Sequence, residues 1–102
     1  MSKEEKLYTE TGQSFKKAEE SQMFGKPCFK INTKAFICFF ENCMVFKLTG
    51  DTHKEALALK GAKLFDPSGK GRAMKEWVQV PYTSKEKWAS YAEAALKYVS
   101  GK

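Results

Sequence analysis

The sequence feature that most constrains the fold is the stretch from Gly69 to Pro81, in which a cationic glycine loop leads into a strand-like run that ends at a proline. Its two glycines allow positive φ angles, and residues 74–80 have the aromatic and β-branched content of a partly buried strand. Pro81 has no backbone N–H to donate, so we expect the strand to stop there. A strand this late in the chain needs partners, which the preceding sequence must supply.

Earlier in the chain, aromatic and β-branched runs alternate with short polar turns. Residues 23–31, 35–40 and 43–48 are predicted to be strands, with turns at 32–34 and at Glu41-Asn42. Residues 35–40 are apolar at every position, which is typical of a central strand covered on both faces. In the next strand, alternation predicts that Met44, Phe46 and Leu48 share one face. Residues 62–65 predict one further, short strand.

Three segments carry a helix start motif followed by apolar residues at helical spacing. A Ser or Thr with a Glu three residues later occurs at Ser2, Thr52 and Thr83, and each pair predicts a capping box. Gly12 lies inside the first helical segment and is expected to bend or break it. The three helices, at the N-terminus, in the middle and at the C-terminus of the chain, flank a run of mostly hairpin-linked strands. This order predicts an α+β fold with a mainly antiparallel sheet of about four or five strands. We expect residues 1–102 to form one domain.

The charge of the chain limits the class of partner. Its 18 Lys and Arg exceed its 12 Asp and Glu, which gives a net charge of +6, but Arg72 is the only arginine. Because bidentate recognition of bases and phosphates relies on arginine, nucleic-acid binding, if it occurs, is expected to be independent of sequence. A protein or another anionic species is the expected partner. No apolar run is long enough to span a membrane, so we expect no membrane partner, and we expect a monomer.

The cysteines and the histidine form no recognisable ligand motif. Cys28, Cys38 and Cys43 contain no Cys-x-x-Cys pair, and His53, the only histidine, is not at ligand spacing from any of them. We therefore expect no metal and no cofactor. All three cysteines lie in apolar runs, where a free thiol behaves as a small buried hydrophobic group. The N-terminal residues lack a signal-peptide pattern, so a reducing cytoplasm is the expected location.

The glycine loop is the first candidate binding site. Lys70, Arg72 and Lys75 fall within six residues, so their cations and the neighbouring backbone amides can converge on a phosphate or a carboxylate. The loop lacks the Gly-Lys-Ser/Thr ending of a Walker loop and leads into a strand instead of a helix. The alternative is a solvent-exposed connection whose glycines serve only the turn.

Glu76 and Trp77 form the second candidate. Alternation places Glu76 on the same face as Met74, Val78 and Val80, so either a carboxylate lies toward an apolar face or Trp77 points away from it. A buried Glu76 would be the polar anchor of a pocket, whereas an exposed one would form a structural ion pair at the margin of the sheet.

Several of these motifs together resemble the TfoX N-terminal domain-like family, which is related to the YjbR-like proteins. The resemblance covers residues 23–99 and is carried by Met23-Phe24-Gly25, Met44-Val45-Phe46-Lys47-Leu48, Phe65-Asp66-Pro67 and Gly71-Arg72-Ala73-Met74-Lys75-Glu76-Trp77-Val78. It implies a small bacterial α+β domain and supplies no catalytic residues. The named TfoX proteins regulate competence genes and carry a second, C-terminal helical domain, which we expect this protein to lack.

The sequence thus predicts a non-enzymatic, cytoplasmic binding module, for which the resemblance implies a regulatory role. The residues predicted to bind the anionic or protein partner are Lys70, Arg72, Lys75, Glu76 and Trp77. The alternative is a small-molecule-binding or enzymatic protein with a pocket between sheet and helices and Glu76 as its polar anchor. No catalytic residue is assigned.

Overall fold

The computed structural model describes residues 2–23, 25–66, 71 and 73–101 of the chain. Over these residues the elements follow in the order α1 (Lys3–Gln13), β1 (Glu19–Met23), β2 (Lys26–Ile31), β3 (Lys34–Phe40), β4 (Cys43–Lys47), α2 (Gly50–Leu57), β5 (Lys63–Phe65), β6 (Met74–Val80), a 3₁₀ helix (Tyr82–Lys87) and α3 (Trp88–Val99). The predicted α+β fold is confirmed, and the described part of the sheet has six strands, slightly more than expected.

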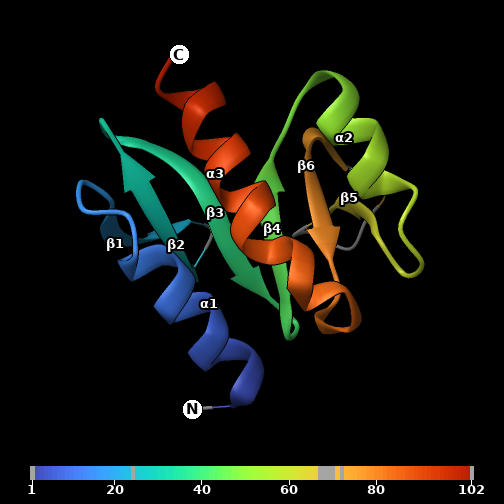
Figure 1. Cartoon of the computed structure of the whole chain (residues 1–102), viewed down its shortest axis with the longest axis horizontal. Coiled ribbons are helices and arrows are strands. Elements are labelled where there is room, and N and C mark those ends of the chain that lie inside the picture. Colours follow the sequence, from blue (N-terminus) through green and yellow to red (C-terminus); the bar gives the residue numbers. More distant parts are fainter. Residues whose placement is uncertain (1, 24, 67–70, 72, 102) are drawn as a thin grey trace.

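The sheet is antiparallel throughout, with strand order β1-β2-β3-β4-β6-β5. The first four strands are consecutive hairpins, and α2 with β5 then forms a crossover that returns the chain to the sheet (Figure 1). Strand β6 is inserted between β4 and β5, with Val80 opposite Met44 and Val78 opposite Leu64. The strand that dominates the sequence is therefore paired on both sides.

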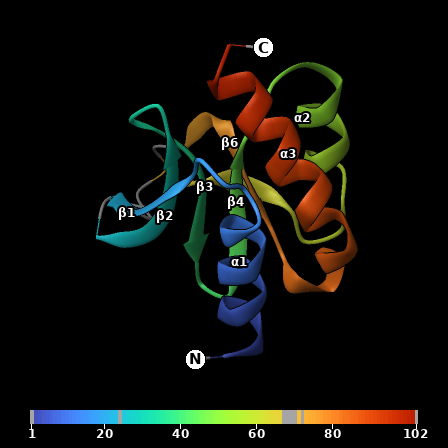
Figure 2. The same ribbon diagram turned by 60° about the vertical axis from the view of Figure 1, so that its left-hand side comes forward.

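All three helices lie on one face of the sheet. In Figure 1, α3 crosses in front of β3 and β4, α2 lies beside β6, and α1 lies next to α3, an arrangement that Figure 2 shows from a second direction. The stripe predicted on the last helix is confirmed, because Trp88, Tyr91, Ala92 and Ala95 are buried in the core between helices and sheet. The predicted face of β4 is also confirmed, with Met44, Phe46 and Leu48 in this core.

The opposite face of the sheet carries a second, smaller apolar cluster. Its buried members are Cys28, Cys38, Val45, Phe65 and Trp77. Cys28 and Cys38 face each other across β2 and β3, and both remain free thiols. The central strands are thus covered on both faces, as the continuous apolar run at 35–40 predicted.

Gly12 permits close packing and does not bend the helix in mid-course. Helix α1 continues through Gly12 and ends at Gln13, one residue later. A Cβ atom at position 12 would lie 2.2 Å from Cε1 of Phe29 on β2, so only glycine fits beneath this ring. Phe15 and Ala18, which follow the helix, still pack against the core.

The prediction of a single strand over residues 23–31 was wrong. Two strands meet there, since β1 (residues 19–23) consists of four polar residues and Met23 and turns into β2 next to Gly25, which has φ 74°. Strand β1 is at the edge of the sheet, and Glu19, Glu20 and Gln22 are exposed. An edge strand with one hydrated side does not need the apolar alternation by which strands are recognised.

Only one of the three predicted capping boxes lies at the start of an α-helix. The hydroxyl of Ser2 accepts a hydrogen bond from the Glu5 amide at 3.1 Å, as predicted. Helix α2 instead begins at Gly50, before Thr52, and its N-cap Thr49 makes no side-chain cap bond. The segment at Thr83 is 3₁₀-helical, and α3 begins at Trp88. There the ring of Tyr82 packs edge-on against Trp88 at 5.6 Å, a tertiary contact that the local motif does not contain.

Candidate functional site

The glycine loop lies largely outside the described residues, which include neither Lys70 nor Arg72. At its described border, the Gly71 amide donates to Oδ2 of Asp66 at 2.9 Å. Lys75 is exposed, and its carbonyl oxygen lies 2.7 Å from Nε2 of His53 in α2. Because a carbonyl only accepts, Nε2 of His53 must carry the hydrogen. His53 therefore ties α2 to the start of β6.

Glu76 lies at the margin of the sheet on the side of the helices, and it is exposed. Its Oε2 accepts a hydrogen bond from the hydroxyl of Tyr98 in α3, and its Oε1 lies 3.9 Å from Nζ of Lys47 in β4. The hydrogen bond to Glu76 raises the pKa of Tyr98, because it stabilises the protonated phenol. Of the two arrangements considered for this carboxylate, the structure has the ion pair at the sheet margin.

Trp77 is buried in the second cluster, on the opposite side of the sheet from Glu76, where its ring centroid lies 6.5 Å from that of Phe65. The predicted position of Met74 was wrong, because Met74 packs with Trp77 and not with Val78. The register of β5 against β6 shifts after Leu64, and this irregularity breaks the strict alternation. Lys75, Glu76 and Trp77 thus do not form one surface.

A different set of side chains comes together around the C-terminal end of α3. We call it the lysine surface, and its members are Lys16 and Lys17 from the α1–β1 connection, Lys34 of β3, Lys47 of β4 and Lys97 of α3. Lys16, Lys17 and Lys97 line one hollow, and Lys34 and Lys47 line a second hollow of about 200 Å³ with Tyr98 and Val99. Asn32 borders the first hollow and Lys34 the second, so the β2–β3 turn connects the two.

The first hollow, which we call the groove, is the larger. It measures about 410 Å³ and is lined by Phe15, Lys16, Lys17, Ile31, Asn32, Leu96, Lys97 and Ser100. Its apolar members come from three segments distant in the sequence and pack in or against the main core. An apolar floor and a cationic rim are therefore held by the fold itself.

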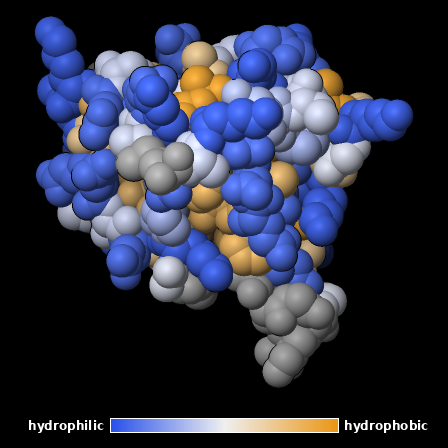
Figure 3. Space-filling model, turned by 90° about the horizontal axis from the view of Figure 1, so that it is seen from below, coloured by the Kyte–Doolittle hydropathy of each residue, from blue (hydrophilic) through white to orange (hydrophobic). Residues whose placement is uncertain are grey.

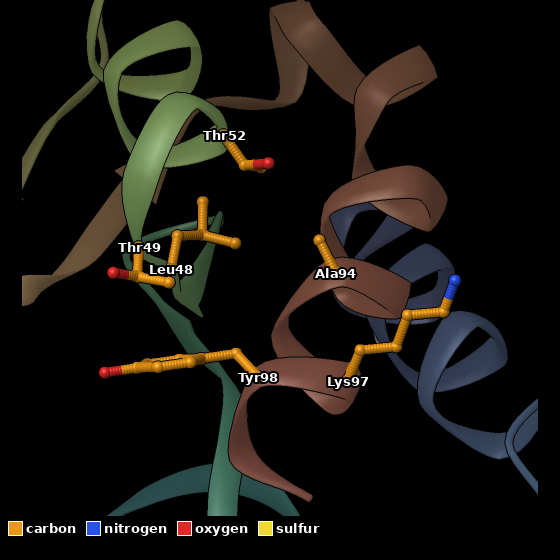
Figure 4. A pocket seen from close by; sticks show the side chains of 6 residues that line it. All are labelled: Leu48, Thr49, Thr52, Ala94, Lys97 and Tyr98. Atoms are coloured by element: carbon orange, nitrogen blue, oxygen red, sulfur yellow. The ribbon is translucent and has the colours of Figure 1, made fainter. Parts of the chain in front are cut away.

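A third hollow, of about 290 Å³, lies between the start of α2 and α3. Figure 4 shows Thr49, Leu48 and Thr52 on one side of it and Ala94, Tyr98 and Lys97 on the other. Tyr98 extends toward Thr49, whereas Lys97 points to the other side of α3, where the groove lies. Tyr98 is 36% exposed, and it is the only exposed large hydrophobic side chain in the described part of the chain. Glu76 does not line this hollow, and its contact with one lining residue is the hydrogen bond that it accepts from Tyr98.

The lysine surface carries more positive charge than its surroundings neutralise. Lys47 pairs with Glu76, and Lys97 lies 3.6 Å from Glu93 one helical turn away. Lys16, Lys17 and Lys34 have no acidic partner within 4 Å among the residues described. The C-terminal ends of α1 and α3 each offer only about half a negative charge.

Exposed charge alone does not distinguish this surface. Hydrophilic side chains also cover most of the end of the molecule farthest from the C-terminus of α3, where apolar atoms show only in patches between them (Figure 3). The lysine surface differs because its cations surround two adjoining hollows, and the larger of these, the groove, has a mainly apolar lining.

The described residues show no arrangement for covalent or metal chemistry. No three His, Cys, Asp or Glu side chains within the described ranges lie close enough together to hold a metal ion. Burial raises the pKa of Cys38 to about 12 and also raises the pKa values of Cys28 and Cys43. Because the thiolate is the nucleophile, these cysteines are poorly reactive near neutral pH.

Across the described part of the chain, no helix is both long and apolar enough to cross a membrane. Comparison of the sequence and the structure with known protein families, with curated proteins and with solved structures gave no match. The resemblance to TfoX N-terminal domains therefore stays a prediction from the sequence.

Sequence reasoning missed the lysine surface. Its members are spread from position 16 to position 97 and share no motif. The excess of basic residues was visible, but the segments that the fold brings together at the end of α3 were not.

Proposed function

We propose that this protein is a non-enzymatic binding module that recognises an anionic partner through the lysine surface. The observation that carries the proposal is the convergence of five lysines from four segments on two adjoining hollows. Three of these lysines have no acidic partner among the described residues, so their charge is available to a ligand. Clustered lysines raise both the local concentration of anions and the rate at which they associate.

The argument for binding rests on the charge of the lysine surface. We further propose a regulatory role, which the sequence resemblance supports, and a location in the cytoplasm, with which the three free thiols agree. The glycine-loop cations Lys70 and Arg72 remain candidates for a second contact with the same partner.

The alternative function, a small-molecule pocket anchored by Glu76, has weaker support. Glu76 does not line the 290 Å³ hollow, and its carboxylate is already engaged by Tyr98 and Lys47. A ligand there would have to displace both contacts.

The test is an amide titration by NMR of the isotope-labelled protein with polyglutamate and, separately, with short single-stranded DNA, at low and high salt. We expect shifts clustered on residues 16–17, 31–34 and 96–100 that weaken steeply with salt, because bound anions displace counterions. The variant Lys16→Glu/Lys34→Glu should lose these shifts. Lys60→Glu, in the α2–β5 connection away from the end of α3, is the matched control (Figure 1). Shifts that spread evenly over the protein, or that ignore salt, would refute the proposal.

A further inference from the structure

The floor of the groove is apolar and rigid. Ile31 is buried, and Phe15 and Leu96 are partly buried and pack against the main core. The ring of Phe15 lies edge-on to the buried Phe36 at 5.8 Å, with the ring planes at 83°. A floor that belongs to the core is already formed before a ligand arrives, so binding costs little ordering entropy.

The rim of the groove is cationic, and among the described residues its lysines form no ion pair other than the exposed one between Lys97 and Glu93. Lys16 and Lys17 have no ion pair among the described residues, and no acidic residue lines the groove. Lys97 pairs with Glu93, but both side chains are more than 60% exposed, and such exposed pairs contribute little to stability. An incoming carboxylate can therefore replace Glu93 at little cost.

Asn32 adds a polar group that suits a peptide backbone. It stands at the groove in the left-handed region with φ 51°, is exposed, and its side-chain amide has no partner within the described ranges. A primary amide both donates and accepts, which matches the N–H and C=O of one peptide unit.

Other anions use these features less completely. A small inorganic anion would contact the lysines and leave the apolar floor hydrated. A single-stranded nucleic acid needs open aromatic faces for stacking, whereas the Phe15 ring is packed against Phe36. An acidic peptide with one large apolar side chain uses the floor, the rim and Asn32 together.

We propose that the groove takes the apolar side chain of an acidic peptide segment in a partner protein, with flanking carboxylates paired to Lys16, Lys17 and Lys97. This inference rests on the proposed function and names its partner class. At about 410 Å³ the groove is near the lower end of ligand sites, which fits one anchor side chain and its neighbours.

The test compares two short peptides rich in Asp and Glu that differ only at a central position, which is Leu in one and Ser in the other. Binding is followed by fluorescence anisotropy at low salt. We expect the Leu peptide to bind about tenfold more tightly, because a partly buried Leu side chain is worth about 1–2 kcal/mol. Lys16→Glu/Lys17→Glu should weaken binding of both peptides.

Leu96→Ala should abolish the preference for Leu while leaving the salt dependence intact. Leu57→Ala is the matched control, since Leu57 packs against the same core from α2 and does not line the groove. If Leu96→Ala unfolds the protein, the comparison of the two peptides on the unmodified protein still decides the question.

The outcomes separate the inference from the proposed function. A Leu preference that depends on Leu96 supports both. Equal, salt-dependent binding of the two peptides overturns the inference and leaves the anion-binding function standing. Binding of single-stranded DNA without binding of either peptide does the same. Binding of none of these probes overturns both.

Discussion

Gly12 is the residue at which one added methyl group should do the most harm. In Gly12→Ala the new Cβ would lie 2.2 Å from a ring atom of Phe29, which is only 2% exposed and has no room to withdraw. Alanine gains about 1 kcal/mol of helix propensity, but overpacking of a core costs about 1–3 kcal/mol. We expect a net loss of up to about 2 kcal/mol in the free energy of unfolding, measured by urea denaturation.

The control is Gln13→Ala, an exposed position on the same helix, which should change stability by less than about 0.5 kcal/mol. Adding Phe29→Leu to Gly12→Ala should recover part of the loss, because the smaller side chain makes room. A Gly12→Ala protein as stable as the original would contradict the packing argument.

Tyr91 should make the protein sensitive to alkaline pH. Its hydroxyl donates to Oε1 of Glu55 at 2.8 Å, and burial together with this bond raises its pKa from 10.0 to about 12. The unfolded chain therefore releases this proton near pH 10, whereas the folded protein holds it until about pH 12. The stabilising contribution of the neutral hydroxyl is complete below pH 10 and is lost as the pH rises to about 12.

We expect the unmodified protein to lose more stability across this interval than Tyr91→Phe, which has no proton to release there, by about 1–2 kcal/mol once solvent screening is counted. Chemical denaturation at several pH values measures the difference, and all other titrating groups are common to both proteins. Parallel pH profiles would show that folding does not raise the pKa of Tyr91.

The two residues of the β2–β3 turn have backbone angles that are unfavourable for most residue types. Asn32 and Thr33 have φ values of 51° and 67°, the left-handed region that a two-residue hairpin requires. Asparagine tolerates this region, but a β-branched threonine does so only with strain. Thr33→Gly should therefore stabilise the protein by about 0.5–1 kcal/mol, the strain relieved less the added flexibility of the unfolded chain.

The β3–β4 turn offers the comparison, since Asn42 has φ 63° and the same role. Asn42→Gly should give a smaller gain, measured by the shift in thermal midpoint. A larger gain at Asn42 than at Thr33 would show that branching at Cβ is not the source of the strain.

Elements with a regular apolar period were predictable from the sequence. The face of β4 and the stripe on α3 were predicted correctly, because burial on a defined face imposes a period of two or of about 3.6 residues, and β3 and β6 were predicted from their apolar, aromatic and β-branched content. Strand β1 was missed, since Glu19 and Glu20 are at a hydrated edge. The starts of α2 and α3 were misplaced because tertiary contacts such as Tyr82 on Trp88 outweigh a local cap motif.

The candidate site was far less predictable, for a different physical reason. Lys16 and Lys97 approach one groove only because α1 and α3 pack side by side on the sheet. The contact of Tyr98 with Glu76 likewise joins positions on two separate elements. No local pattern encodes such meetings, whereas the charge excess that motivated the search is a property of the composition.

At the scale of the whole molecule, the net charge is +6, and repulsion among the clustered lysines should lower the stability of the free protein. Lys34 is exposed, has no acidic partner among the described residues, and shares its hollow with Lys47. Lys34→Glu replaces repulsion with attraction, so we expect the free energy of unfolding to rise by about 0.5–1 kcal/mol at low salt.

The same substitution should weaken binding of an acidic probe, so stability and affinity should move in opposite directions. Lys34→Gln, which only removes the charge, should give about half of each effect, and high salt should reduce both. In Lys60→Glu the affinity should stay unchanged, because that position is outside the lysine surface. A cluster retained only for solubility would show the gain in stability without the loss of affinity, and urea denaturation and anisotropy on the same preparations distinguish the two cases.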